Sequence, residues 1–202
     1  MPHIDPLNRS DLPQFEEAFA RYDAIRGFLP NSILTMGRRP NIAAAFMELN
    51  QAILYEGTVP EALKMMVALM TSMATGCRYC QGHMANLSHV YEVPDDKINA
   101  VWDCETSPLF TDAERAALVL AREAAGVPNT VDPEHFDTLK KHFTEAEIVE
   151  IVASIALFGY LNRWNDTMAT TMEPKPAQVA IQAMPGWDGG KHGMEDTVAP
   201  TS

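Results

Sequence analysis

Apolar residues recur every three or four positions along almost the whole chain, and this spacing constrains the fold more than any other feature. Between residues 60 and 76 it places the apolar side chains on one face of a helix, as core residues: Leu63, Met66, Val67, Met70 and Met73. No segment alternates apolar and polar residues long enough to indicate a β-strand of a half-buried sheet. The sequence therefore predicts an all-α protein.

Start and stop signals divide this pattern into eight expected helices. Prolines open several of them, glycines end others, and the pairs Thr111–Glu114 and Thr144–Glu147 form capping boxes. The expected helices cover residues 12–28, 40–55, 60–76, 77–91, 94–104, 111–125 and 144–172, with another beginning at Asp132-Pro133.

The chain divides into one helical domain and a tail. The periodic pattern ends near residue 173, and from Pro174 onward proline, glycine and isolated polar residues dominate. We expect residues 1–173 to form a single all-α domain. Residues 174–202 are expected to form an extended C-terminal tail, a loop or an arm lying on a neighbouring molecule.

Two segments of the chain are similar to each other. When Thr144 is aligned with Val59, Glu150 falls on Met65, and without gaps Asn162 and Asn165 fall on two cysteines, Cys77 and Cys80. Any two amphipathic helices match to some extent, so one interpretation is chance. The other is a bundle of two pseudo-repeats whose second copy has lost its thiols.

Charge and composition exclude several classes of partner. The formal net charge is −12 and no cluster of Lys and Arg interrupts the acidity, so we expect no nucleic acid as a partner. The best apolar stretch, residues 148–161, is too short for a membrane span and contains Glu150. The N-terminus lacks the basic start and apolar run of a signal peptide. We expect a cytoplasmic protein with no membrane partner.

The most informative motif is Gly-Cys-Arg-Tyr-Cys-Gln-Gly-His at residues 76–83, which holds two of the three cysteines. Cys77, Cys80 and His83 are three residues apart, so a helix places them on one broad side. Two thiols and an imidazole are the parts of a dithiol redox centre. They are also three of the four ligands of a zinc site.

Redox chemistry suits this motif in a reducing compartment, where Cys-x-x-Cys is seldom a permanent crosslink. A thiol reacts as thiolate, the start of a helix favours negative charge, and a nearby histidine can relay the proton. Once one sulfur is oxidised to sulfenic acid, the other closes a disulfide, which an external dithiol reduces. The predicted centre needs neither a cofactor nor a metal.

Two alternatives remain open: a zinc-binding module, and a redox-silent helical oligomer that serves as a scaffold or binding protein. A structural zinc site commonly takes four ligands from two clustered pairs. The other candidate ligands are scattered singly along the chain: His89, Cys104, His135 and His142. We therefore favour the redox interpretation, with Cys104 as a buried small apolar residue and His89 as a surface residue.

Over residues 28–172 the sequence resembles the alkylhydroperoxidase D-like group of the carboxymuconolactone decarboxylase superfamily. The resemblance rests on Leu-Pro-Asn-Ser-Ile-Leu with Arg-Arg-Pro within residues 29–40, on the motif at 76–83, and on Asn-Arg-Trp-Asn-Asp at 162–166. It implies an all-α helical bundle that assembles into homo-oligomers. It also implies a thiol peroxidase that reduces a hydroperoxide and is recycled by a dithiol or protein reductant.

The resemblance also implies roles for the site residues. By the family pattern Cys80 becomes the sulfenic acid, and Cys77 is the proton donor and resolving partner. The family's usual glutamate and histidine positions hold Met65 and Met84 here, while His83 matches a variant pattern. Because Glu150 aligns with Met65 and interrupts an apolar run, we expect it to face this site and supply the missing acid.

Overall fold

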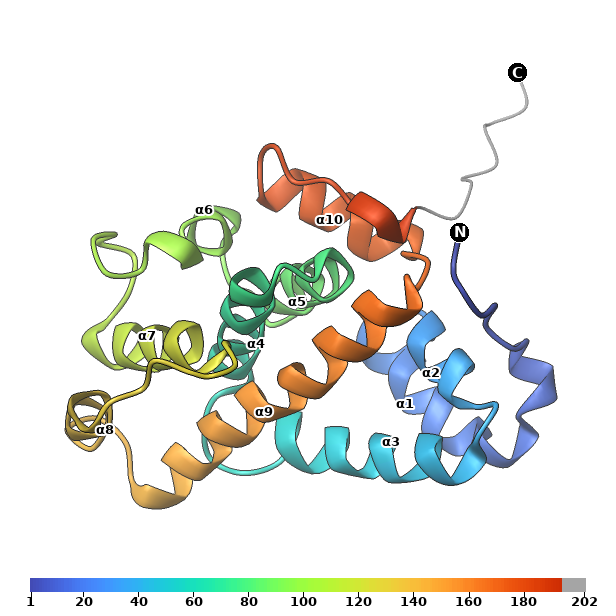
Figure 1. The fold of residues 1–202 in the computed structure, drawn as a ribbon, viewed down its shortest axis with the longest axis horizontal. Helices are drawn as coiled ribbons and strands as arrows, with labels where there is room; N and C mark the ends of the chain where they lie inside the picture. Colours follow the sequence, from blue (N-terminus) through green and yellow to red (C-terminus); the bar gives the residue numbers. More distant parts are fainter. Residues whose placement is uncertain (194–202) are drawn as a thin grey trace.

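The structure, a computed structural model, describes residues 1–193, and over this range it consists of helices and turns without a β-strand (Figure 1). The predicted all-α class is confirmed. The α-helices are α1 (Glu16–Arg26), α2 (Asn31–Met36), α3 (Pro40–Leu54), α4 (Glu61–Thr75), α5 (Arg78–Val90), α6 (Asp95–Asn99), α7 (Asp112–Ala124), α8 (Pro133–Leu139), α9 (Glu145–Met168) and α10 (Pro174–Ala183). Four short 3₁₀ turns accompany them: η1 (Arg9–Asp11), η2 (Pro13–Phe15), η3 (Val101–Asp103) and η4 (Gly190–His192).

Both predicted capping boxes are present. At the start of α7 the Glu114 N–H donates to Thr111 Oγ1 at 3.2 Å, and the Thr111 N–H donates to Glu114 Oε2 at 2.9 Å. At the start of α9 the corresponding distances for Thr144 and Glu147 are 3.3 and 2.8 Å. Each box satisfies two N–H groups that a helix start leaves without partners.

Helices α4 and α5 form the centre of the molecule. Residues 63–72 of α4 and 79–88 of α5 are buried without interruption. A helix that is covered on all sides needs neighbours around it. Helices α7, α9 and α10 pack around this central pair (Figure 1).

The two segments that are similar in sequence share one helix, α4 or α9, and differ in structure beyond it. Helix α4 ends at Thr75 and α5 begins at Arg78, whereas α9 runs unbroken through the aligned positions Asn162 and Asn165. Helix α4 begins at Glu61 and α9 at Glu145, each within two residues of the aligned pair Val59 and Thr144. The turn that carries the cysteine motif has no structural counterpart in α9.

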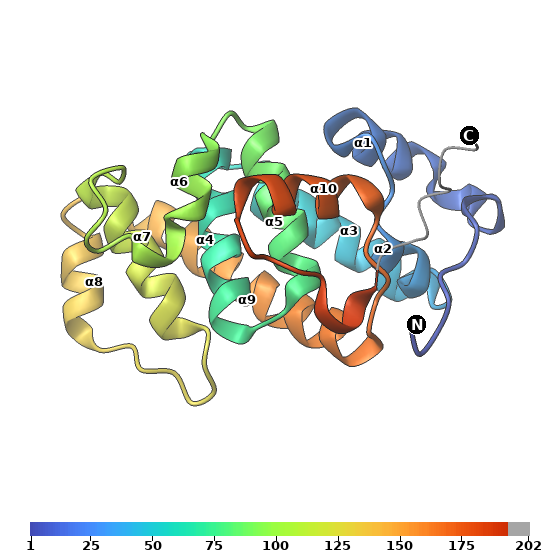
Figure 2. The same cartoon turned by 90° about the horizontal axis from the view of Figure 1, so that it is seen from above.

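The predicted extended tail is wrong for its first half. Residues 174–183 form α10, which packs against α5 and α6, and Figure 2 shows it in front of α5. Proline at the first helical position has the φ angle that a helix needs and lacks only an N–H that would be unpaired there. The small residues Ala177, Ala180 and Ala183 then bury one face of α10. Residues 194–202 of the predicted tail lie outside the described residues.

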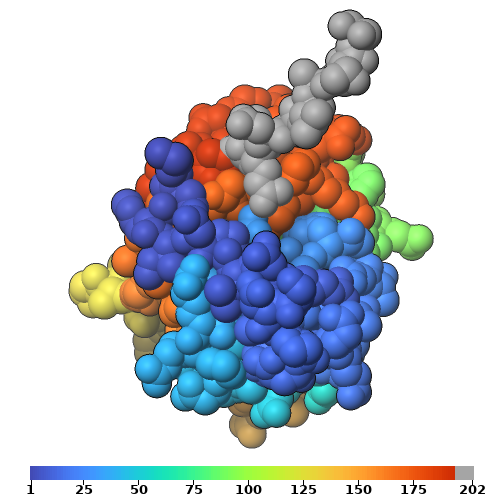
Figure 3. Space-filling view, turned by 90° about the vertical axis from the view of Figure 1, so that its right-hand side faces the viewer, coloured from blue at the N-terminus to red at the C-terminus, as the bar shows by residue number. Residues whose placement is uncertain are grey.

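The N-terminal segment lies against the end of α9. The His3 N–H donates to the Met168 carbonyl at 3.0 Å, and Figure 3 shows the N-terminal segment beside the end of α9 and the segment that follows it. Within residues 1–193, every helix is too short or too polar to traverse a lipid bilayer.

Candidate active site

The turn between α4 and α5 places the first cysteine of the motif. Gly76 ends α4 in the left-handed region at φ +80°, a conformation that favours glycine. Cys77 follows in an extended conformation as the N-cap of α5, and only 1% of its surface is exposed. Its sulfur therefore lies at the positive end of a helix, which favours a thiolate.

Contacts around Cys77 favour its ionised form. Hydrogen bonds from the Cys80 thiol and from His192 lower the pKa of Cys77 to about 5, against the opposing effect of burial. At neutral pH this cysteine is therefore a thiolate, the nucleophilic form of the side chain.

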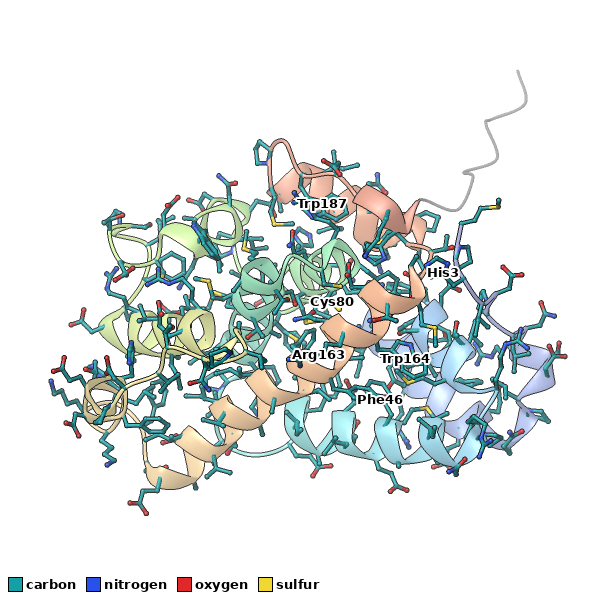
Figure 4. The ribbon with its side chains drawn as sticks, in the orientation of Figure 1. His3, Phe46, Cys80, Arg163, Trp164 and Trp187 are labelled. Carbon is teal, nitrogen blue, oxygen red and sulfur yellow. The ribbon has the colours of Figure 1, made fainter. Side chains whose placement is uncertain are left out.

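Cys80 lies one helical turn further along and keeps its proton. Burial raises the pKa of Cys80 well above its ordinary value, and the adjacent Cys77 thiolate raises it further. The Asn165 side chain of α9 donates a hydrogen bond to the Cys80 sulfur at 3.4 Å. Figure 4 shows Cys80 at the centre of the molecule, beside α9. The pair thus holds one proton and one negative charge between its two sulfurs.

Thr170 fixes the amide of Asn165. Its hydroxyl donates to Asn165 Oδ1 at 2.9 Å, which leaves the amide N–H groups directed toward the sulfur. When residues 144–165 are aligned with residues 59–80, Asn165 falls on Cys80. In the structure the two residues are in contact, and Asn165 donates a hydrogen bond to Cys80.

His83 forms a buried pair with Glu173. The distance from His83 Nε2 to Glu173 Oε2 is 2.7 Å, and the His83 ring stacks on Tyr79 with centroids 4.3 Å apart. The second carboxylate oxygen, Oε1, accepts the Tyr79 hydroxyl at 2.8 Å and the Asn31 N–H at 2.5 Å. These contacts hold both the ring and the carboxylate in one orientation.

Glu173 remains ionised although it is buried. Burial alone would raise its pKa, but the attraction and hydrogen bond of His83 and the Asn31 N–H hold the pKa of Glu173 below its ordinary value. Glu173 is the N-cap of α10, so the helix that the sequence did not predict supplies this carboxylate. No spacing pattern marked it, because it lies 90 residues beyond His83 in the chain.

The prediction that Glu150 serves this site is wrong. Its carboxylate accepts the Thr58 and Val59 N–H groups at 2.9 and 3.0 Å and pairs with Lys64 Nζ at 2.9 Å. Gly57 makes room for it, since a Cβ there would overlap with the carboxylate. Glu150 therefore neutralises the buried ammonium of Lys64 and ties α9 to the loop before α4.

His192 is a further site residue that the sequence did not predict. Its Nδ1 donates to the Thr170 carbonyl at 3.0 Å, and its Nε2 lies on the side of the ring that faces Cys77 and Asp166. The distance from Nε2 to Asp166 Oδ1 is 3.8 Å. The buried ring comes from η4, near the end of the described chain, where composition alone indicated a tail.

A small cavity adjoins Cys80 and His83. Its volume is about 30 Å³, room for about one water molecule. Apolar and aromatic side chains form most of its wall, together with Arg26, Ser32, Asn50 and Asn165. A much larger hollow of about 810 Å³ lies along α9 around Tyr160 and Trp164, and neither motif cysteine lines it.

The remaining candidate ligands lie outside this cluster. His89 is exposed and contacts Asp95 at 3.2 Å, and Cys104 is fully buried in the core. Among residues 1–193, no three His, Cys, Asp or Glu side chains are grouped in a way that could hold a metal ion.

Sequence comparison defines the class of this protein. Residues 40–123 match the model of the carboxymuconolactone decarboxylase family. The chain is 41% identical over 73 residues to the uncharacterised protein YnjA of Escherichia coli (strain K12), a match that covers 36% of this chain and 40% of that protein.

Structural comparison extends the likeness to the whole fold. The debrominase Bmp8, as a cysteine-to-alanine variant in complex with 2,3,4-tribromopyrrole, has a TM-score of 0.85 at 38% identity, covering 91% of this chain and 98% of that one. An AhpD-core, peroxidase-related protein from Ralstonia eutropha JMP134 has a TM-score of 0.76 at 23% identity, covering 87% and 94% of the two chains, which is evidence of a shared fold.

These matches and the helical fold identify the family. The chain belongs to the carboxymuconolactone decarboxylase and alkylhydroperoxidase D-like superfamily, as the resemblance in the sequence predicted. The superfamily includes enzymes, among them the debrominase.

Proposed function

We propose that this protein is a thiol-dependent reductase that transfers two electrons from the Cys77–Cys80 dithiol to a hydroperoxide. One observation carries the proposal: a low-pKa thiolate at the start of α5 is hydrogen-bonded to a second, buried thiol. A dithiol with one ionised sulfur is poised for nucleophilic attack and for disulfide closure. The cavity beside Cys80 has room for the oxygen atoms of a small peroxide.

In the first step Cys77 acts as a base toward its neighbour. The Cys77 thiolate takes the proton of Cys80, and the new Cys80 thiolate attacks the terminal oxygen of the peroxide. The O–O bond breaks, Cys80 becomes a sulfenic acid, and the alkoxide that leaves takes the proton from Cys77. This order keeps the roles that the family resemblance implies, since Cys80 is oxidised and Cys77 donates the proton.

In the second step Cys77, again a thiolate, attacks the Cys80 sulfur. A disulfide forms and hydroxide leaves, taking a proton from the His83–Glu173 pair to give water. The dithiol monoanion, the hydroperoxide and one proton thus give a disulfide, an alcohol and water. An external dithiol then reduces the disulfide by exchange and restores both thiols.

A second candidate is reductive dehalogenation, which the 38% identity to a debrominase along nearly the full chain favours. An aryl bromide and the dithiol would give the arene, bromide, a proton and the same disulfide. Phe46 and Phe158 in the cavity wall have flat faces that an aromatic ring can pack against once the wall moves apart, since the cavity itself holds about one water molecule. Both candidates use the same two sulfurs and differ in the atom that accepts the electrons.

Thiol titration with cysteine variants tests the proposal. Reduced protein should lose two thiols on addition of an alkyl hydroperoxide and regain them with dithiothreitol. Cys77→Ser should react more slowly, because the base for Cys80 is lost, and should stop at a sulfenic acid on Cys80 that dimedone traps, whereas Cys80→Ser should consume no peroxide. Cys104→Ser is the matched control and should behave like the parent.

The other outcomes each favour a different function. Thiol loss with a bromopyrrole and release of bromide, without thiol loss to peroxide, favours the dehalogenase. Unchanged thiols with both reagents contradict a reductase and favour a redox-silent oligomer. Release of stoichiometric zinc on thiol modification favours a metal-binding module. Trapped sulfenic acid on Cys77 would reverse the roles of the two sulfurs.

A further inference from the structure

Arg26, the last residue of α1, carries a buried positive charge without a carboxylate. Only 5% of its surface is exposed. Its Nη2 donates to the Tyr55 hydroxyl at 3.0 Å, and its guanidinium carbon lies 5.5 Å from the centre of the Tyr22 ring. Its Nε–H is buried and has no acceptor among the described residues.

The other deeply buried Lys, Arg, Asp and Glu side chains in residues 1–193 are paired. Lys64 lies 2.9 Å from Glu150, and Glu173 lies 2.7 Å from His83. A buried charge without an opposite charge is costly, because its attraction to water is lost and nothing replaces it. Of the deeply buried Lys, Arg, Asp and Glu side chains in residues 1–193, Arg26 is therefore the one that forms no ion pair with a carboxylate.

Arg26 lines the same cavity as Cys80 and His83. No aspartate or glutamate lines that cavity, so the guanidinium faces a space that has no carboxylate. Phe46 of α3 and Phe158 of α9 form apolar parts of the wall. The cavity thus combines a cation, an apolar wall and a reactive sulfur.

We propose that Arg26 binds the carboxylate of an organic acid, and that the rest of this molecule occupies the cavity beside Cys80. A planar guanidinium matches a carboxylate with two parallel hydrogen bonds, and its free Nε–H supplies one of them. Under the proposed function the bound acid is the substrate, a carboxylate-bearing hydroperoxide. The binding step itself does not depend on the reaction.

A second small cavity indicates the route by which the acid reaches Arg26. It is lined by the exposed Arg21 and the half-buried Gln51, and it shares Tyr22 and Asn50 with the cavity at Cys80. Asn50 Nδ2 donates to the Tyr22 hydroxyl at 3.4 Å, a long and weak hydrogen bond. Because the inner cavity has room for about one water molecule, binding of a ring requires its wall to move, and we expect this weak contact to open first.

Calorimetry with reduced protein tests the inference without any redox reaction. The probes are acetate and benzoate, each compared with its neutral amide, acetamide or benzamide. At least one acid should bind and should bind more tightly than its amide. Arg26→Met should weaken acid binding about tenfold or more, the usual size of a charge-assisted hydrogen bond. Arg39→Met, which removes an exposed charge at the N-cap of α3, should bind as the parent does.

Folding of Arg26→Met is checked by thermal denaturation, and we expect little loss of stability because an unpaired buried charge is removed. Arg26→Lys keeps the charge without the planar fork and should bind with intermediate affinity. Equal binding of acid and amide, equal binding by Arg26→Met, or no binding of either acid would overturn the inference. Acid binding that depends on Arg26, in a protein that reduces no peroxide, would uphold the inference and refute the proposed function.

Discussion

At the scale of single residues, the glutamate that contacts His83 is Glu173 and not Glu150, the one that the sequence suggested. Glu150 interrupts an apolar run and invited a catalytic interpretation, yet it binds Lys64 and two backbone N–H groups. Glu173 gave no signal, because it precedes a proline in a segment whose composition indicated a tail. Burial and long-range contact, which sequence spacing does not encode, decide which carboxylate reaches His83.

Glu150→Gln should therefore destabilise the protein and leave thiol reactivity intact. Burial opposes its ionisation, but the N–H groups of Thr58 and Val59 and the Lys64 ammonium lower the pKa of Glu150 from 4.5 to about 2. The carboxylate keeps a fifth of its surface in water, so we expect a loss of about 2 kcal/mol in the free energy of unfolding.

The pH dependence follows from the sign of this shift. A lowered pKa contributes stability that is complete above pH 4.5 and is lost as the pH falls toward 2, so parent and Glu150→Gln should converge in acid. Urea denaturation at several pH values measures this. Glu173→Gln is the matched comparison and should slow thiol oxidation by peroxide. Slower oxidation in Glu150→Gln, with unchanged stability, would restore Glu150 to the site.

At the scale of elements, the C-terminal segment, residues 172–193, completes the site because α5 leaves space for it. Gly82 allows the close approach, since a Cβ there would lie 2.9 Å from Met172 Cε and 3.3 Å from Trp187 Cζ2. The Trp187 indole N–H donates to Gln81 Oε1 at 3.2 Å and anchors the segment. Figure 4 shows Trp187 above Cys80. Glu173 and His192 arrive with this segment.

Gly82→Val should displace the segment from α5. The branched side chain meets the rigid Trp187 ring, whereas the single methyl of Gly82→Ala meets the flexible end of Met172. Limited proteolysis should cut the valine variant between residues 184 and 193 much faster than the parent. The alanine variant should resist, helped by the higher helix propensity of alanine. Equal resistance of all three proteins would contradict the packing argument.

The helices themselves were largely predictable, and the reasons are local. Capping boxes and apolar spacing specify α7 and α9 from a few adjacent residues. Helices α2 and α10 were not predicted, since one has six residues and the other carries two prolines in its first turn. Both are held by contacts with distant segments, such as the bond from the Asn31 N–H to Glu173.

At the scale of the whole molecule, an apolar face on α9 remains exposed. Val149, Val152 and Tyr160 lie on it at helical spacing, with exposed fractions of 67, 39 and 42%. Val127, from the loop after α7, is 79% exposed and lines the large hollow beside Val152 and Tyr160. A contiguous apolar surface of this kind is typical of an interface.

We propose that this face joins copies of the chain into a homo-oligomer. Light scattering at micromolar concentration should give a mass that is a multiple of 22.3 kDa. Val149→Lys combined with Val152→Lys should lower it toward one chain, because two charges would be buried at the contact. Val90→Lys, on a different helix, should leave the mass unchanged. A mass of one chain for the parent would contradict the proposal.

The proposed mechanism depends most on the ionisation state of Cys77, which thiolate ultraviolet absorbance measures directly during a pH titration. We predict one thiolate that forms near pH 5, disappears in Cys77→Ser and persists in Cys104→Ser. In His192→Asn the transition should move to higher pH, because a hydrogen bond to the sulfur is lost. A Cys77 that ionises at its ordinary value of 9.0, unaffected by His192, would contradict the mechanism.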